Sequence, residues 1–216
     1  MDNMINDFEN SYRNLRRQPN DGWNTEELAQ SQFSIVTDIL HRDDISDGML
    51  LDLGCGDGKL TIKLAQSGFE TYGIDFAPTA ISWANERAKA ESVSASFIVG
   101  DVLHLPYLAE QFEAVVDSFC FHCIIGEKRK TFLSEAFRVL KRSKVLIIMT
   151  KCGDPKDASY PFDPLTRCKI ENGVSTRYMG LPQSIIEEVK SSGFTILDYR
   201  IFPYDQDLLV INAQKL

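Results

Sequence analysis

The segment from residue 51 to 58 reads LDLGCGDG, and in it three glycines alternate with other residues directly after a short apolar run. Because they lack side chains, Gly54, Gly56 and Gly58 allow backbone N–H groups to approach a ligand closely. The N-terminus of the helix predicted to follow favours negative charge. The loop is therefore predicted to bind a ligand through its backbone.

Asp75 follows Gly54 by 21 positions and lies at the end of the next predicted strand. A carboxylate there can accept hydrogen bonds from both hydroxyls of a ribose, so the two features together indicate a nucleoside cofactor. The same pair of features also serves NAD, and an isolated Gly-x-Gly is often only a tight turn. At this point the identity of the cofactor stays open.

Two later segments distinguish between these cofactors. Gly100-Asp101-Val102 ends the third predicted strand, and FEAVVD at 112–117 begins the fourth. The successive segments LDLGCGDG, YGID, GDVLHLP and FEAVVDSFCFH resemble, in order and spacing, the motifs of class I S-adenosylmethionine-dependent methyltransferases. The resemblance covers about residues 49–150. It implies S-adenosylmethionine as the cofactor.

The resemblance also implies roles for individual residues. Asp52, Gly54 and Gly56 would frame the methionine part and Asp75 would hold the ribose. Asp101 would accept from the exocyclic amine of adenine while the Val102 N–H donates to a ring nitrogen, although Gly-Asp after a strand is also a common turn. The cofactor-binding residues that we expect are Trp23, Asp52, Gly54, Cys55, Gly56, Asp75, Phe76, Asp101, Val102, Ser118 and Phe119.

The exit of the fourth strand, residues 117–124, is where we expect the methyl acceptor, because ligands of open α/β sheets bind beyond the carboxyl ends of the strands. Methyl transfer from an activated sulfonium depends largely on alignment, and a base is needed only for a protonated nucleophile. His122 is the candidate catalytic base, since neutral imidazole can accept a proton near physiological pH. A structural imidazole bonded to backbone is the competing interpretation.

Cysteines gather near the same exit, with Cys120 and Cys123 beside His122 and Cys152 after the fifth predicted strand. Thiolate and imidazole donors could hold a soft metal ion or metalloid. Cysteine is also commonly buried, and a single Cys-x-x-Cys lacks the second pair of a typical zinc site, so we expect no bound metal. The odd total of five cysteines makes a disulfide framework improbable.

The pattern of the elements predicts an α/β fold: a Rossmann-like, seven-stranded, mostly parallel sheet with helices on both faces and an antiparallel last strand. Helices are predicted at 25–40, 58–66, 79–90, 184–191 and around 132–140. The predicted strands span residues 49–53, 71–75, 97–99, 114–118, 145–150, 195–202 and 208–213. Arg142-Ser143-Lys144 stands where many relatives have Pro-Gly-Gly, so the turn before the fifth strand is expected to differ.

We expect one domain over 1–216 with two additions. Residues 1–45 would form an N-terminal helical cap, in which Asn24 and Glu27 are spaced as a capping box. Residues 151–180 have no clear period and would form a lid or substrate insertion, or else a flexible surface excursion. The lid carries a net charge of about +1, which allows an anionic substrate, although such mixed charge usually marks a solvated face.

Aromatic side chains in these two additions could close over the cofactor or the substrate, although aromatic residues more often pack as core or interface. They are Tyr12, Trp23, Tyr160, Phe162 and Tyr178.

The composition of the chain disfavours some classes of binding partner. The formal net charge is −8, which disfavours an extended phosphate-binding surface and therefore a nucleic acid substrate. No signal-like or membrane-spanning apolar stretch appears, so a cytoplasmic protein without membrane contact is expected. The expected substrate is a small molecule with an O, N or S nucleophile. The sequence leaves the acceptor and the oligomeric state open.

Two further function classes stay open beside the methyltransferase. A nicotinamide-dependent oxidoreductase is opposed by the adenine-reading segment and by Gly-x-Gly-x-Gly in place of Gly-x-Gly-x-x-Gly. A cofactor-binding but catalytically inactive partner subunit remains, because no catalytic residue is obligatory. Amino-methylation of the kind that uses an Asn/Asp-Pro-Pro-Tyr signature is disfavoured, since residues 117–120 read DSFC.

Overall fold

The computed structural model describes residues 2–17, 22–171, 173–204 and 206–216. The chain divides into two compact units, Met1–Pro106 and Tyr107–Leu216.

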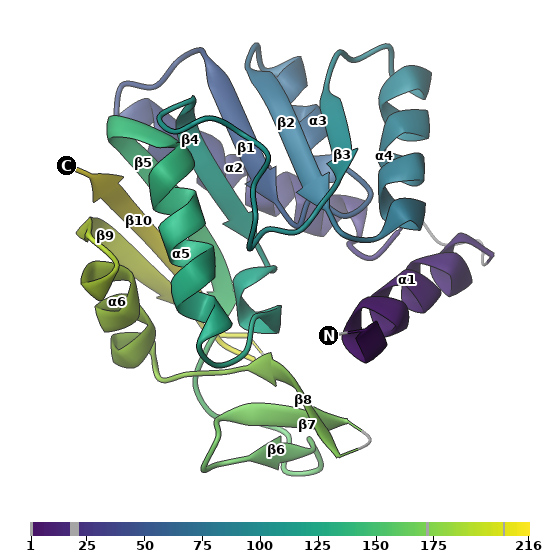
Figure 1. Ribbon diagram of the computed structural model, residues 1–216, viewed down its shortest axis with the longest axis vertical. Helices are drawn as coiled ribbons and strands as arrows, with labels where there is room; N and C mark the ends of the chain where they lie inside the picture. Colours follow the sequence, from purple (N-terminus) through teal and green to yellow (C-terminus); the bar gives the residue numbers. More distant parts are fainter. Residues whose placement is uncertain (1, 18–21, 172, 205) are drawn as a thin grey trace. The chain divides into compact units, whose positions relative to one another are not determined.

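The first unit is built on three parallel strands, β1 (Met49–Leu53), β2 (Glu70–Asp75) and β3 (Ser96–Val99). Strand β2 pairs with β1 on one side and with β3 on the other. All three strands therefore end at the same edge (Figure 1). The glycine loop follows β1, Asp75 is the last residue of β2, and Asp101 comes shortly after β3. The topology itself brings the predicted cofactor residues to one edge.

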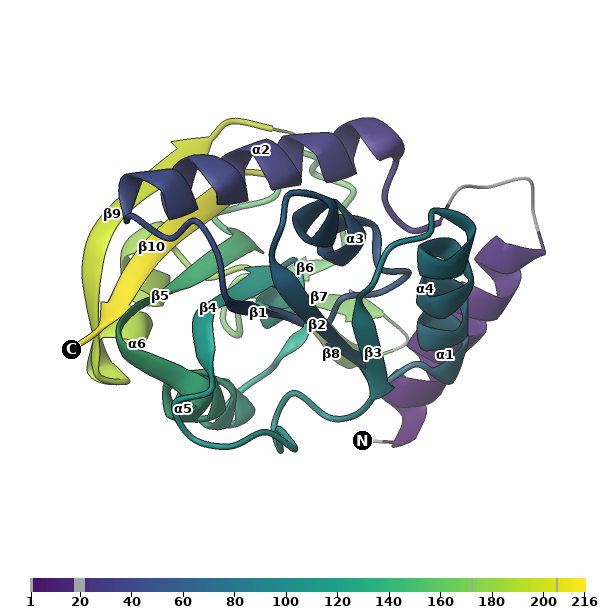
Figure 2. The ribbon, with the colours of Figure 1, turned by 90° about the horizontal axis from the view of Figure 1, so that it is seen from above.

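Four helices accompany these strands: α1 (Asp2–Arg16), α2 (Glu26–Arg42), α3 (Lys59–Gln66) and α4 (Pro78–Ala90). Helix α2 buries Val36, Ile39 and Leu40 on one face, at the spacing of an amphipathic helix. Helix α4 buries mostly small residues, among them Ala80 and Ala84, which permit close packing on β2 and β3. Figure 2 shows α2 and α3 lying side by side.

The second unit contains the strands β4 (Phe112–Ser118), β5 (Leu140–Lys151), β9 (Phe194–Phe202) and β10 (Leu208–Lys215). Strand β4 pairs with β5 in parallel, whereas β10 is antiparallel to both β5 and β9. Helices α5 (Lys128–Val139) and α6 (Pro182–Ser191) pack on this sheet. A short 3-10 helix, η1 (Phe121–Cys123), follows β4 and packs against β5.

The seven-stranded sheet has the order β3-β2-β1-β4-β5-β10-β9, which confirms the predicted Rossmann-like α/β fold with antiparallel strands at its end. All seven predicted strands are present. Strand β5 begins five residues earlier than predicted, directly after α5, and continues through Arg142-Ser143-Lys144. Ser143 has a φ of 59° there, so an irregularity replaces the expected turn. In the connection between the last two strands, Asp205 lies outside the described residues.

The N-terminal part differs in detail from the sequence prediction. Helix α1 was not predicted, since its sequence is strongly polar. The predicted capping by Asn24 is wrong: the N-cap of α2 is Thr25, whose side-chain oxygen accepts from the Leu28 N–H at 3.2 Å. Thr25 precedes the first helical residue directly, so its hydroxyl satisfies an N–H of the first turn. Met1 and residues 18–21, within the predicted cap 1–45, lie outside the described residues.

Residues 151–180, where no periodic pattern was recognised, contain a second sheet. Strands β6 (Phe162–Asp163), β7 (Cys168–Glu171) and β8 (Val174–Tyr178) form it in antiparallel order. The strands are two to five residues long, too short for an alternation to be read from the sequence. Asn172 of this segment lies outside the described residues, and the assignment of the segment as a lid stays a prediction. No helix within the described ranges has the length and apolar character needed to cross a membrane.

The core of the second unit provides a test of this packing. Phe132 of α5 is 0% exposed and stacks on Phe121 with the ring centroids 5.0 Å apart. Phe132→Ala is expected to lower the free energy of unfolding by about 3–5 kcal/mol, because it removes buried apolar surface and leaves a cavity. Urea denaturation followed by circular dichroism measures the change. The control Leu165→Ala, at a side chain that is 94% exposed, should shift stability by less than about 0.5 kcal/mol. Equal effects of the two variants would contradict this account.

Candidate functional site

The glycine loop after β1 is held against β2 by backbone hydrogen bonds. The Gly54 and Cys55 N–H groups donate to the Ile74 carbonyl at 2.8 and 3.0 Å. Gly58 has a φ of 80° and lies directly before α3, and a Cβ atom on it would lie only 2.8 Å from the Cβ of Ala84. Both the backbone conformation and the contact with α4 therefore require glycine at position 58. The loop is a fixed turn that opens a helix.

Asp75 connects this loop to the end of β2. Its Oδ2 accepts from the Gly56 N–H at 3.0 Å and its Oδ1 accepts from the Ala77 N–H at 2.9 Å. The side chain is buried, which raises its pKa to about 6 even though both hydrogen bonds favour the charged form. Each carboxylate oxygen still has a second lone pair. The residue predicted to hold the ribose thus also fixes the glycine loop, a role that the spacing alone did not indicate.

Asp52 lies on β1 beneath the loop and is 3% exposed. Its Oδ2 accepts from the Thr61 hydroxyl at 2.6 Å, whereas its Oδ1 has no hydrogen-bond partner within the part of the chain that the structure describes. Burial raises the pKa of Asp52 to about 7, with a smaller contribution from the charge of Asp75. A buried acceptor without a donor is costly to the fold, and it suits a cationic amino group.

An aromatic cluster flanks the loop in the first unit and includes two of the predicted site residues. Trp23 lies 5.5 Å from Tyr12 and 5.8 Å from Phe8, and Phe8 meets Phe76 edge to face at 5.7 Å. A Cβ atom on Gly56 would lie 2.6 Å from the Tyr12 hydroxyl oxygen, which places Tyr12 directly against the glycine loop. Trp23 remains 44% exposed.

Helix α1 brings Phe8 and Tyr12 to this position through Glu9. One carboxylate oxygen of Glu9 accepts from the Thr79 N–H at 3.0 Å and the other from the Thr79 hydroxyl at 2.5 Å. Thr79 lies in the first turn of α4, so α1 is fastened to the helix that follows Asp75. Tyr12 and Trp23 were predicted as aromatic residues that could close over a ligand, whereas the helix that positions Tyr12 was not predicted from the polar sequence.

Asp101 and Val102 follow β3 at the same edge of the first unit. The Asp101 Oδ1 accepts from the Leu103 N–H at 2.9 Å, and the His104 Nδ1 lies 3.7 Å from Oδ2. The Asp101 side chain is 39% exposed, and the side chain of Val102 is buried. These contacts are those of a turn after a strand, which was the alternative interpretation of Gly100-Asp101. The turn also leaves the carboxylate accessible to a ligand, so the adenine-reading role stays a prediction.

In the second unit, the end of β4 turns sharply into η1. Asp117 is fully buried, and its Oδ1 accepts from the Cys120 N–H at 3.1 Å and from the Phe121 N–H at 2.8 Å. Phe119 has a φ of 68° and donates its N–H to the Met149 carbonyl at 2.9 Å. A bulky residue in the left-handed region costs on the order of 1 kcal/mol or more and is often found at functional sites.

His122 is the central residue of η1 and is 4% exposed. Its Nδ1 makes no hydrogen bond to any residue that the structure describes, and both interpretations of this imidazole, catalytic base and structural group, stay predictions. Burial lowers the pKa of His122 well below 6.5, and the charges of Lys151, Arg177 and Arg129 lower it further. The imidazole is therefore neutral at physiological pH.

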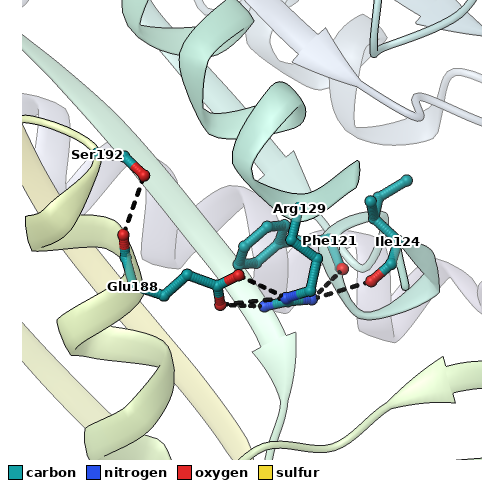
Figure 3. A network of polar contacts seen from close by, with 5 residues as sticks. All are labelled: Phe121, Ile124, Arg129, Glu188 and Ser192. Atoms are coloured by element: carbon teal, nitrogen blue, oxygen red, sulfur yellow. Dashed lines mark hydrogen bonds and ion pairs between the residues drawn. The ribbon is translucent and has the colours of Figure 1, made fainter. Parts of the chain in front are cut away.

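Arg129 of α5 joins η1 to α6 and was missed by the sequence analysis (Figure 3). Its guanidinium donates to both carboxylate oxygens of Glu188 at 2.8–3.1 Å and to the carbonyls of Phe121 and Ile124 at 2.8 and 3.2 Å. The guanidinium also lies 3.7 Å from the ring centroid of Phe121 and 4.4 Å from that of Tyr178. Arg129 thus fixes both ends of the helical turn that carries His122.

The cysteines do not form a metal site among the described residues. No group of three His, Cys, Asp or Glu side chains there has an arrangement that could hold an ion. The five cysteines are free thiols. Cys152 donates to the Asp207 carbonyl at 3.5 Å, and burial raises its pKa to about 11. The Cys123 thiol contacts the Phe119 carbonyl oxygen at 3.8 Å.

The buried Asp52 carboxyl makes stability depend on pH. The folded protein retains the Asp52 proton up to a pH of about 7, whereas the unfolded chain loses it near 3.8, so the free energy of unfolding falls as the pH rises through this window. Asp52→Asn keeps an acceptor for Thr61 and should raise the free energy of unfolding at pH 8 by on the order of 2 kcal/mol.

Denaturant unfolding of both proteins at pH 5 and pH 8 measures this difference. The exposed Asp47, in the turn before β1, provides the control Asp47→Asn, which should change neither stability nor its pH dependence. A destabilised Asp52→Asn protein at pH 8 would show that the carboxylate is stabilised by a donor other than Thr61.

The sequence matches known proteins over its central part. Residues 50–143 match the family model described as a methyltransferase domain. The chain is 36% identical over 103 residues to a putative methyltransferase, YqeM, of Bacillus subtilis, covering 46% of this chain and 41% of that protein. It is 32% identical over 111 residues to demethylmenaquinone methyltransferase of Thermus thermophilus, covering 50% of each. The chain thus spans half the length, or less, of these curated relatives.

A solved structure matches over nearly the whole chain. It is 1,6-didemethyltoxoflavin-N1-methyltransferase of Burkholderia thailandensis, with 1,6-didemethyltoxoflavin and S-adenosylhomocysteine bound. The TM-score is 0.77 at 21% identity, and the match covers 98% of this chain and 86% of that one. At this identity the likeness concerns the fold. Residues 50–143, somewhat less than half of the chain, are thus similar in sequence to a methyltransferase domain, and the fold is that of the S-adenosylhomocysteine-bound neighbour.

Proposed function

We propose that this protein transfers a methyl group from S-adenosylmethionine to an O, N or S nucleophile of a small molecule, in the cytoplasm. The observation that carries the proposal is the set of groups at the carboxyl edge of the first unit. There the glycine loop, Asp52, Asp75 and Asp101 follow or end three parallel strands. Ligands of open α/β sheets bind at this edge.

The polar and aromatic groups at this edge suit each part of the cofactor. The unpartnered Oδ1 of Asp52 is an acceptor for the ammonium group of the methionine part, beside the backbone of the glycine loop. The remaining lone pairs of Asp75 would accept from the ribose hydroxyls, and the accessible carboxylate of Asp101 from the adenine amine. Trp23 and Phe76 supply aromatic surface next to these groups. These residue roles are proposals.

The reaction needs little from the protein beyond alignment. The bound cofactor supplies a methyl group already activated by its positive sulfur. A lone pair of the acceptor forms the new bond to the methyl carbon while the carbon–sulfur bond breaks and its electron pair stays on sulfur. Where the acceptor atom carries a proton, we assign the removal of that proton to His122, whose neutral Nδ1 has no partner in the described chain.

The relatives support a small acceptor. One of them is named for demethylmenaquinone, and the structural neighbour holds 1,6-didemethyltoxoflavin. The formal charge of −8 disfavours nucleic acid as the acceptor.

Asp75 gives the first functional prediction. Asp75→Asn replaces one acceptor oxygen by an NH₂ group that opposes a backbone N–H, so affinity for S-adenosylhomocysteine should fall about 10- to 100-fold. Isothermal titration calorimetry measures this, with Asp47→Asn as the matched exposed control. NADH should give no heat of binding. If the protein bound NADH but neither S-adenosylmethionine nor S-adenosylhomocysteine, the methyltransferase interpretation would be wrong and the oxidoreductase interpretation would take its place.

His122 gives the second functional prediction. In a labelled-methyl assay over thiols, phenols, amines and carboxylates, His122→Ala should lower kcat about 10²- to 10⁴-fold on a protonated acceptor. His41→Ala, at an exposed position on α2, should keep full activity. Full activity of His122→Ala would remove His122 from the reaction. No turnover by the wild-type protein on any class would favour an inactive, cofactor-binding subunit.

A further inference from the structure

Lys151 is the last residue of β5 and is partly buried. Within the described chain its ammonium group has no hydrogen bond or ion pair. Other cations of the segment 151–180 do have carboxylate partners. Lys156 lies 2.7 Å from Asp207, and Arg167 lies 2.5 Å from Asp154. Because a partly buried cation without a counterion is unfavourable, Lys151 stands out in this segment.

Two more cations lie on neighbouring strands of the small sheet. Lys169 of β7 and Arg177 of β8 are directly paired in register, so their side chains leave the same face. Both reach one carboxylate, that of Glu171, at 2.6 and 3.2 Å. Their side chains are only 20% and 18% exposed, whereas Glu171 is 41% exposed. One carboxylate that faces solvent is thus the shared ion-pair partner of two cations whose side chains are largely buried.

Arg177 and Lys169 act on Lys151, and two of the three cations, Lys151 and Arg177, act on His122. Burial lowers the pKa of Lys151, and the charges of Arg177 and Lys169 lower it further, opposed by the Cys123 thiol. Lys151 and Arg177 in turn lower the pKa of His122. Strands β5 and β8 both pack against η1, so Lys151 and Arg177 come to the helical turn that carries His122, and Lys169 lies beside Arg177 on the next strand. The third cation acting on His122, Arg129, is neutralised by Glu188.

We propose that Lys151, Arg177 and Lys169 bind an anionic oxygen group, a carboxylate or a phosphate, of the methyl acceptor. This assignment rests on the proposed function, because it names the acceptor class of the same enzyme. Like charges held close together in partly buried positions are stabilised by a bound anion. Lys169 and Arg177 keep their contacts with Glu171, while Lys151 supplies the charge that the protein itself leaves without a partner.

A bound anion would also change His122. A negative group beside Lys151 and Arg177 offsets the charges that oppose protonation of the imidazole. His122 then becomes a stronger proton acceptor once the acceptor molecule is in place. The charges that surround the imidazole come from β5, β8 and α5, and the anion would lie among those of β5 and β8.

The test is an NMR titration of the purified protein at pH 7 and low ionic strength. The probes are inorganic phosphate and benzoate, with neutral benzamide as the comparison ligand. The signal is the imidazole resonance of His122, identified by its loss in His122→Ala among three histidines. We expect a saturable shift with both anions and none with benzamide. Lys151→Gln should raise the apparent Kd for each anion at least 10-fold.

Lys144→Gln is the matched control, because it removes the same charge near the opposite end of the same strand. It should change the apparent Kd less than 2-fold. Absence of a saturable anion shift, or equal Kd values for wild type and Lys151→Gln, overturns the proposal. Titration with S-adenosylhomocysteine separates the two claims. Cofactor binding without anion binding overturns only the anion site, and anion binding without cofactor binding overturns the proposed function together with the acceptor assignment.

Discussion

The carboxylate of Asp75 is the constraint on which the first unit depends. It is buried, it carries a raised pKa, and it holds the glycine loop through the Gly56 N–H and the start of α4 through the Ala77 N–H. Without a fixed acceptor at the end of β2, the left-handed glycines would cost conformational entropy and would have no reason to order. A single side chain therefore determines the shape of the loop that opens α3 and the start of the helix that holds α1.

The second unit has a comparable centre in Arg129 and Asp117. Asp117 satisfies two N–H groups at the beginning of η1, and Arg129 donates to the carbonyls of Phe121, its first residue, and of Ile124, directly after its last. A helix of three residues cannot satisfy its own termini, so these buried charges replace the missing backbone partners. The guanidinium is balanced by Glu188, which keeps a buried ion pair intact. His122 is thereby held rigidly without a bond to its own Nδ1.

Several buried side-chain atoms lack a hydrogen-bond partner among the described residues, and the Oδ1 of Asp52 and the Nδ1 of His122 are two of them. The ammonium group of Lys151, which is partly buried, also has no hydrogen bond or ion pair there. Each of these three groups lowers the stability of the fold, and each presents a defined donor or acceptor to a ligand. Departures from local optimisation are expected where a protein binds and reacts, because the missing partner is the ligand.

The sequence by itself determined the order of the seven main strands along the chain, the position of most helices and the edge where the glycine loop, Asp75 and Asp101 meet, since these follow from short-range pattern and parallel topology. It did not reveal α1, whose polar sequence is held by Glu9 and Thr79, nor the short strands β6–β8. Only the tertiary structure decided that Asp75 fixes the glycine loop, that Arg129 fixes η1, and that Lys151 and Arg177 lie near His122 with Lys169 beside Arg177. These relations join residues distant in sequence, and their strength depends on burial, which no local pattern encodes.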